Sequence, residues 1–204
     1  MKRLSVMAML LLVVITLSAQ AAKQEALESL DTAKALINKG DYVKAQEEMN
    51  FAQAKISEIV AEELLKHIPE KPKGFVFDSK ETTSLGQAGA IIGSANAVAA
   101  VGHYSKDDSS FDVTITMGGA LGQAGGLMSG LASMFGGMAT GTTQIRVSGY
   151  TGTQEFDKSA GTGSLTIKVG NKISVIITGE DITNPDILKT LAEQVDMALL
   201  EKSF

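Results

Sequence analysis

Apolar and polar residues alternate in a series of short segments of this chain. Residues 111–117 read Phe-Asp-Val-Thr-Ile-Thr-Met, and residues 165–169 and 173–177 have a similar period of two. This period is typical of a β-strand that turns one face toward a core. The second half of the chain is therefore expected to form a sheet.

Turn-forming residues separate these segments and indicate how the strands connect. Residues 106–110, Lys-Asp-Asp-Ser-Ser, precede one strand, and Gly170-Asn171 is a tight turn of the kind that favours positive φ. Further strands are expected at 75–77, at 98–104, and from Ile145 to a return strand containing Glu155 and Phe156. Strands in hairpin succession with helices at the ends predict an α+β fold, an antiparallel sheet flanked by helices.

Residues 22–67 are expected to form a helical hairpin that precedes the sheet. Apolar residues recur there at three- and four-residue spacing, and residues 38–41, Asn-Lys-Gly-Asp, interrupt them. Gly40 suits a left-handed C-cap and Asp41 suits the N-cap of the next helix. The side chains expected inside the hairpin are those of Leu30, Leu36, Met49 and Ile56.

The turn of this hairpin, Leu36-Ile-Asn-Lys-Gly-Asp-Tyr-Val-Lys-Ala45, resembles the turn of a tetratricopeptide repeat. The resemblance covers one hairpin, and a solenoid needs about three or more repeats to bury its faces. The hairpin is therefore interpreted as a two-helix packing element.

Two prolines, Pro69 and Pro72, mark the predicted boundary between the hairpin and the sheet. Residues 68–73 are expected to form a short linker, and residues 74–204 an antiparallel α+β domain. The domain is expected to close with an amphipathic helix over residues 184–200, where Pro185 fits the first turn.

Residues 1–21 have the pattern of a secretory signal peptide. Lys2 and Arg3 precede an apolar run from Leu4 to Leu17, and small residues at 19 and 21 give an A-x-A cleavage site before Ala22. The sequence contains no cysteine, so neither a disulfide framework nor a lipid attached to a cysteine is expected. An exported, periplasmic location is predicted.

The charge of the remaining chain argues against nucleic-acid binding. Lys2 and Arg3 account for two of the 18 basic residues, so 16 basic residues remain against 23 acidic ones, a formal charge of −7. Nucleic acid needs clustered Lys and Arg, which displace its counterions. No nucleic-acid partner is therefore expected.

Residues 118–141 form a glycine-rich insert without charged residues. Gly118, Gly122, Gly126 and Gly130 lie four residues apart, and Leu85-Gly-Gln-Ala-Gly89 is repeated at 121–125. The spacing resembles glycine-zipper membrane segments, in which small residues let helices approach closely. Two interpretations stay open: soluble packing through an apolar stripe that starts at Leu127, or membrane contact or homo-oligomerisation through these glycines.

No catalytic, cofactor-binding or metal-binding motif is recognised. His67 and His103 are the two histidines and lie in unrelated predicted elements, so a closed zinc site is not expected. Met128, Met134 and Met138 are possible soft copper ligands, but methionines at helical spacing more often fill a core. We therefore expect no enzyme activity.

A wider resemblance extends from Ile68-Pro-Glu-Lys-Pro-Lys-Gly-Phe75 to Ser164-Leu-Thr-Ile-Lys-Val-Gly-Asn-Lys-Ile-Ser-Val-Ile-Ile-Thr-Gly179 and the helix after it. This part resembles a group of uncharacterised exported bacterial proteins. More distantly, the order of elements is similar to that of the extrinsic photosystem-II subunit fold. Neither resemblance implies an active site.

These observations predict a non-enzymatic periplasmic accessory or binding protein whose ligand is unknown. The alternative is an envelope protein that inserts in the membrane or self-associates through its glycine-zipper segments.

Overall fold

The computed structural model describes residues 2–84, 97–118 and 142–204, with side chains over 20–82, 97–118 and 142–204. The chain divides into two compact units, Met1–Glu62 and Glu63–Phe204. The first consists of helices and the second is built around a sheet, so the expected α+β fold is confirmed.

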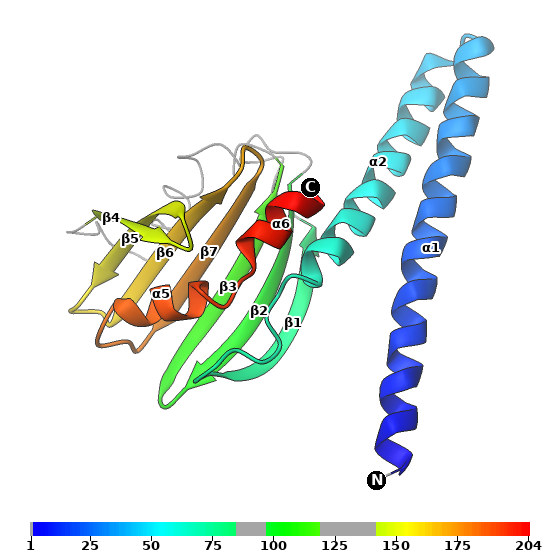
Figure 1. The fold of residues 1–204 in the computed structure, drawn as a ribbon. Helices are drawn as coiled ribbons and strands as arrows, with labels where there is room; N and C mark the ends of the chain where they lie inside the picture. The colour runs from blue at the N-terminus through cyan, green and yellow to red at the C-terminus, as the bar shows by residue number, and fades with distance from the viewer. Residues whose placement is uncertain (1, 85–96, 119–141) are drawn as a thin grey trace. The chain divides into compact units, whose positions relative to one another are not determined.

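The first unit is an antiparallel helical hairpin of α1 (Lys2–Asn38) and α2 (Tyr42–Leu65), whose last turn belongs to the second unit (Figure 1). The predicted turn is confirmed. Gly40 has a φ of 79°, and Oδ1 of Asp41 accepts a hydrogen bond from the backbone N–H of Lys44 at 3.4 Å. Among the helical residues that the structure describes, no stretch is long and apolar enough to cross a membrane.

Small side chains, not large ones, are buried where the two helices meet. This alanine seam, as we name it, consists of Ala22, Ala26, Ser29 and Ala33 on α1 and of Ala45 and Ala52 on α2. The prediction for Leu30, Met49 and Ile56 is wrong, since each is 44–46% exposed, and Leu36 is half-buried. Alanine lets two helices approach closely, which leaves the longer side chains beside the contact.

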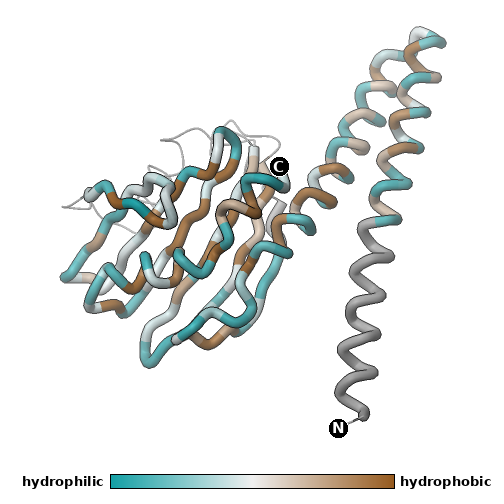
Figure 2. The backbone as a smooth tube through the Cα atoms, in the orientation of Figure 1, coloured by the Kyte–Doolittle hydropathy of each residue, from teal (hydrophilic) through white to brown (hydrophobic). Residues whose placement is uncertain are grey.

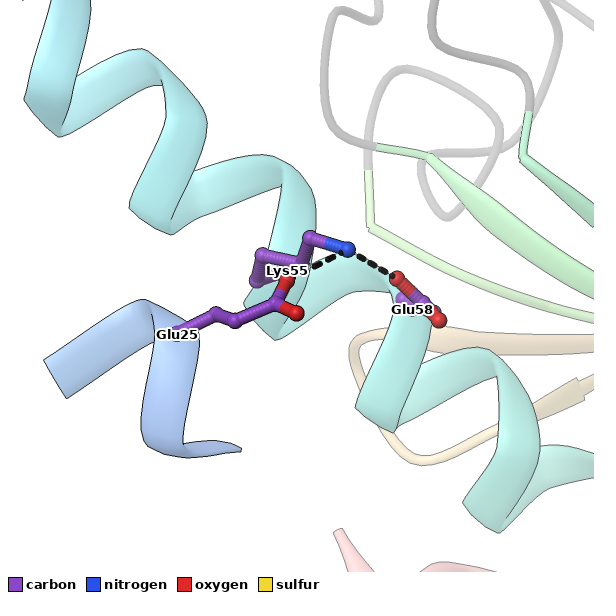
Figure 3. A network of polar contacts seen from close by, with 3 residues as sticks. All are labelled: Glu25, Lys55 and Glu58. Carbon is purple, nitrogen blue, oxygen red and sulfur yellow. Dashed lines mark hydrogen bonds and ion pairs between the residues drawn. The ribbon is translucent and has the colours of Figure 1, made fainter. Parts of the chain in front are cut away.

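One side of the hairpin carries a polar bridge between the helices. The Lys55 Nζ lies 2.8 Å from Oε2 of Glu25 on α1 and 3.3 Å from Oε2 of Glu58 on α2 (Figure 3). Hydrogen bonds to these carboxylates, Glu25 foremost, raise the pKa of Lys55. The bridge therefore identifies the side on which Glu25 and Lys55 face each other.

The second unit contains a seven-stranded antiparallel sheet in the order β1-β2-β3-β7-β6-β5-β4. Its strands are β1 (Val76–Ser84), β2 (Val98–Lys106), β3 (Ser109–Met117), β4 (Thr142–Val147), β5 (Tyr150–Asp157), β6 (Thr162–Val169) and β7 (Ile173–Glu180). The predicted strands are confirmed, except that β1 extends over Val76–Ser84 where the sequence predicts a short strand at 75–77. In the middle of the sheet, β3 pairs with β7. These strands are far apart in the sequence, so a succession of hairpins does not predict that they are neighbours.

Two short helices, α5 (Asp186–Ala192) and α6 (Met197–Ser203), follow the last strand and cross one face of the sheet (Figure 1). A single helix over 184–200 is therefore a wrong prediction. Asp196 interrupts it, because its side chain accepts a hydrogen bond from the N–H of Leu199 at 2.9 Å and caps a new helix.

The covered face holds the core of this unit. Its strand residues include Tyr104, Phe111, Val113, Ile115, Leu165, Ile167, Val175 and Ile177, all buried, and hydrophobic positions line the central strands in Figure 2. Leu188 of α5 lies over this face, because a Cβ on Gly179 would come within 2.9 Å of its side chain.

The predicted linker packs on the same face. Tyr104 is 1% exposed and donates a hydrogen bond to the carbonyl of Pro69 at 2.8 Å. Burial raises the pKa of Tyr104. Ile68 is buried over Gly102, and the Phe75 ring meets Phe111 edge-on at 5.3 Å. Residues 68–75 thus belong to the sheet unit.

Candidate functional site

The face opposite α5 and α6 carries a continuous row of polar side chains across all seven strands. Register pairs link its members from one edge to the other. We call it the polar row, and its members in spatial order are Ser79, His103, Asp112, Thr178, Ser164, Glu155 and Thr142. At about 4.8 Å per strand, it extends for about 29 Å.

The alternation of the strands places the polar row on this face. Phe111 and Val113 point into the core, so Asp112 between them points away from it. In the same way, Thr178 lies between Ile177 and Gly179, both of which face the core. The polar row therefore points outward from strands whose other face is packed into the core.

His103 and Asp112 form the shortest side-chain contact in the row. The Nδ1 atom of His103 lies 2.7 Å from Oδ1 of Asp112, and its Nε2 atom lies 3.9 Å from Oε1 of Glu81 on β1. The side chains of His103 and Asp112 are 37% and 47% exposed. A proton on Nδ1 is donated to Asp112, and this hydrogen bond fixes the orientation of the ring.

This pair resembles the histidine and aspartate of a hydrolytic triad, but its second ring nitrogen lies beside a carboxylate. A general base needs its second nitrogen near a nucleophile, and Nε2 of His103 faces Glu81. Ser79 is the register partner of His103, yet among the described residues His103 makes no hydrogen bond to a hydroxyl. The arrangement can orient donors and acceptors toward a ligand.

The far end of the row is also acidic. Glu155 lies between Ser164 and Thr142 in register, and the Thr142 hydroxyl donates to its Oε1 atom at 3.5 Å. The polar row contains no Lys or Arg. Its carboxylates and hydroxyls therefore favour an uncharged or cationic ligand over an anionic one.

A second candidate is a surface hollow of about 310 Å³ between the β4–β5 turn and the link from α5 to α6. Tyr150, Glu193 and Asp196 line it. The Tyr150 hydroxyl donates to Oε2 of Glu201 at 2.7 Å, which raises the pKa of Tyr150, and Asp196 already caps α6. Two of its polar groups are thus engaged within the protein.

The residues singled out in the sequence are not brought together. His67 lies against the Phe204 ring, 6.0 Å between centroids, and His103 lies in the polar row. In the described ranges, no three His, Asp or Glu side chains are placed to hold a metal ion.

The glycine-zipper prediction falls largely outside the described residues. Gly118 directly follows β3 with a φ of 80°, which is not helical, and its N–H donates to the carbonyl of Lys172 at 3.3 Å. Gly122, Gly126 and Gly130, and the first copy from Leu85 to Gly89, lie outside the part of the chain that the structure describes.

Sequence reasoning missed the polar row because its members are scattered over residues 79–178. The signal was present in the polar residues of each alternating strand, such as Asp112 and Thr178. These residues become neighbours only when the order of the strands is known.

Comparison of the chain with models of known protein families, with curated proteins and with solved structures found no match.

Proposed function

We propose that this protein is an exported, non-enzymatic binding protein of the bacterial envelope, which holds a polar ligand against the polar row. The observation that carries the proposal is the row itself: hydrogen-bonding side chains in register across the sheet, with His103 oriented by Asp112. Hydrogen bonds from a rigid scaffold bind well because little conformational freedom is lost.

The proposed ligand is extended and uncharged or cationic, and rich in hydroxyl or amide groups. Asp112, Glu155 and the neighbouring Glu81 repel anionic polymers, and the net charge of −7 expected for residues 22–204 acts in the same direction. A glycan strand and a cationic peptide both have this chemistry. The row has the length to contact several units of such a chain.

Isothermal titration with chito-oligosaccharides and with oligolysine tests this proposal. Asp112→Asn removes one charge and retains the shape, so we expect the affinity to fall by about 10- to 100-fold, the value of a charge-assisted hydrogen bond. Glu193→Gln makes the same chemical change in the second hollow and should leave binding unchanged. Failure of both probes to bind, or loss of binding only in Glu193→Gln, would contradict the proposal.

The non-enzymatic part of the proposal has its own test. A broad hydrolase screen should give no turnover above background for the wild-type chain. Reproducible turnover that disappears in His103→Gln would mean that the His103–Asp112 pair acts as a base, and the protein would then be an enzyme.

The periplasmic location rests on the leader pattern of residues 1–21. Fractionation of a bacterial host should recover the protein from the soluble periplasm with Ala22 as its N-terminal residue. An uncleaved chain in the cytoplasm would contradict this location.

The alternative proposal is membrane insertion or self-association through the glycine zipper without Gly118, which is not helical. Gly122, Gly126 and Gly130 remain, and their four-residue spacing supports it. Carbonate extraction should then leave the protein in the membrane pellet. Gly126→Leu should disrupt assembly, whereas Gly126→Ala, which keeps a small side chain, should not. A protein that washes off and is unaffected by Gly126→Leu excludes this function.

A further inference from the structure

Large apolar side chains lie exposed beside the alanine seam of the helical hairpin. Leu30 and Ile37 on α1 are 44% and 47% exposed, and Tyr42, Met49 and Ile56 on α2 are 69%, 44% and 46% exposed. We call these five residues the apolar row. Both the seam and the row follow a repeat of seven residues, which is the repeat of helices that pack in bundles.

The heptad pattern assigns a single position to the whole row. The seam residues Ala26, Ser29 and Ala33 are spaced as positions a and d. Leu30 and Ile37 then occupy position e on α1, and with Ala45 and Ala52 at position a, Tyr42, Met49 and Ile56 occupy position e on α2. Position d is small or apolar on α1, at Ala22, Ser29 and Leu36, but charged on α2, at Glu48 and Lys55. Positions a and e are therefore the ones that α2 offers for apolar packing, and position e widens its apolar face beyond the seam.

The polar bridge establishes that both halves of the row lie on the same side of the hairpin. At about 100° per residue, Glu25 lies about 70° from the centre of the seam on α1 in one direction, and Leu30 about 70° in the other. On α2, Lys55 and Met49 likewise lie on opposite sides of the seam. Since Lys55 bonds Glu25, Leu30 and Met49 lie together on the opposite side.

The levels of the row match across the hairpin. Counted from the turn at Gly40, Ile37 is level with Tyr42, and Leu30 is level with Met49, because the helices are antiparallel. A two-fold axis parallel to the helices therefore places α1 of one copy against α2 of another, with Leu30 facing Met49. Every pair of adjacent helices in this arrangement is antiparallel, as in many four-helix bundles.

We propose that the apolar row packs against the apolar row of a second copy of this chain, forming a four-helix bundle. The row contains no carboxylate, and the one charged residue at the same heptad position in residues 22–62 is Lys23, at the open end. A copy therefore brings apolar groups onto apolar groups without like-charge contacts. The exposed area of the five side chains is on the order of 400 Å² per copy, about half of what each partner contributes to a standard interface.

Analytical ultracentrifugation of residues 22–204, the chain expected after removal of the leader, between 1 and 100 μM tests the association. The wild type should sediment as a dimer, and Leu30→Gln with Met49→Gln should shift the dissociation constant by at least 100-fold toward the monomer. Phe51→Gln is the matched control. Phe51 is 48% exposed but lies on the other side of α2, with the Lys55 Nζ 5.6 Å from its ring centroid. This variant should remain dimeric.

Engineered cysteines test the register, because the chain has none of its own. An equimolar mixture of Leu30→Cys and Met49→Cys chains should form a disulfide-linked dimer under mild oxidation, and each variant alone should form far less. Cross-linking of Leu30→Cys with itself would instead place α1 against α1 and overturn the arrangement.

Two further outcomes contradict the proposal. A wild-type monomer at 100 μM would mean that another part of the chain or a different protein covers the row. A dimer that survives Leu30→Gln with Met49→Gln would mean that association uses a different surface. Far-ultraviolet circular dichroism of each variant should show the helix content of the wild type, which separates loss of association from loss of folding.

Discussion

At the scale of single residues, close contacts above the sheet depend on the absence of a side chain. A Cβ on Gly102 would collide with Ile68 and come within 2.7 Å of the Tyr104 hydroxyl. Gly102→Ala should therefore displace the segment around Ile68 and lower the free energy of unfolding of the second unit by about 1–3 kcal/mol.

Urea denaturation followed by circular dichroism measures this effect. Ser110→Ala, at an exposed position of β3, is the control and should change the free energy of unfolding by less than about 0.5 kcal/mol. Equal stability of Gly102→Ala and wild type would mean that residues 68–75 do not pack on Gly102 in solution.

The free energy of unfolding is expected to depend on pH through His67. Desolvation lowers its pKa below the ordinary value of 6.5, although Glu63 and Asp196 act in the opposite direction. The folded state thus binds the proton less well than the unfolded state. The contribution of uncharged His67 to the free energy of unfolding is complete above about pH 6.5. It is lost as the pH falls through the lower pKa of the folded state.

Thermal melts at pH 7.5 and pH 5 test this dependence. The melting temperature should fall less in His67→Gln than in the wild type over this interval, because the variant has no proton to bind at this position. An identical fall in both proteins would show that the burial of His67 does not influence stability.

The sequence predicts the orientation of single residues of the polar row, but not which residues of the row are neighbours. The alternation predicted that Asp112 and Thr178 point away from the core, but not that they are neighbours. Their adjacency comes from the pairing of β3 with β7, which are separated by more than 50 residues. Outward polar residues carry no pattern that identifies a partner strand.

At the scale of elements, the hairpin shows why helix cores are hard to assign from periodicity. The alanine seam and the apolar row both recur at heptad spacing, so the pattern alone allows either to be the contact. The larger side chains are predicted to form the core because they are more hydrophobic than alanine. The structure instead uses Ala26, Ala33, Ala45 and Ala52, whose size permits close approach.

The alanine seam predicts a size limit at its centre. Ala52→Leu adds three carbons where Ala52 is 1% exposed, so it should force the helices apart and cost about 1–3 kcal/mol. Helix melting at 222 nm measures the change. Val43→Leu, at a position that is 73% exposed, is the control and should melt like the wild type. A stable Ala52→Leu hairpin would contradict the seam.

At the scale of the whole molecule, the order of elements and the fold class could be predicted, whereas the boundary between units is less apparent in the sequence. Pro69 and Pro72 have the composition of a linker, yet Pro72 is buried and the carbonyl of Pro69 accepts the Tyr104 hydrogen bond. The structure changes unit between Glu62 and Glu63. The linker over 68–73 stays a prediction for experiment.

Two truncated chains distinguish these boundaries. A chain that starts at Glu63 keeps Leu64, Ile68 and the Pro69 carbonyl, and one that starts at Gly74 loses all three. Loss of a buried aliphatic side chain costs about 2–5 kcal/mol, so the shorter chain should melt at least about 5 °C lower. Calorimetry of both fragments measures the difference. Equal melting temperatures would favour the boundary at 74.

The pairing of β3 with β7 has a consequence for how the chain acquires its structure. Strands β1 to β3 and strands β4 to β7 each follow one another as neighbours, but the two groups are joined through this single ladder. A ribosome must therefore synthesise about nine-tenths of the chain before the sheet can close. Such non-local contacts slow folding to milliseconds or longer. For the export proposed above, this delay would leave time for an unfolded chain to be translocated.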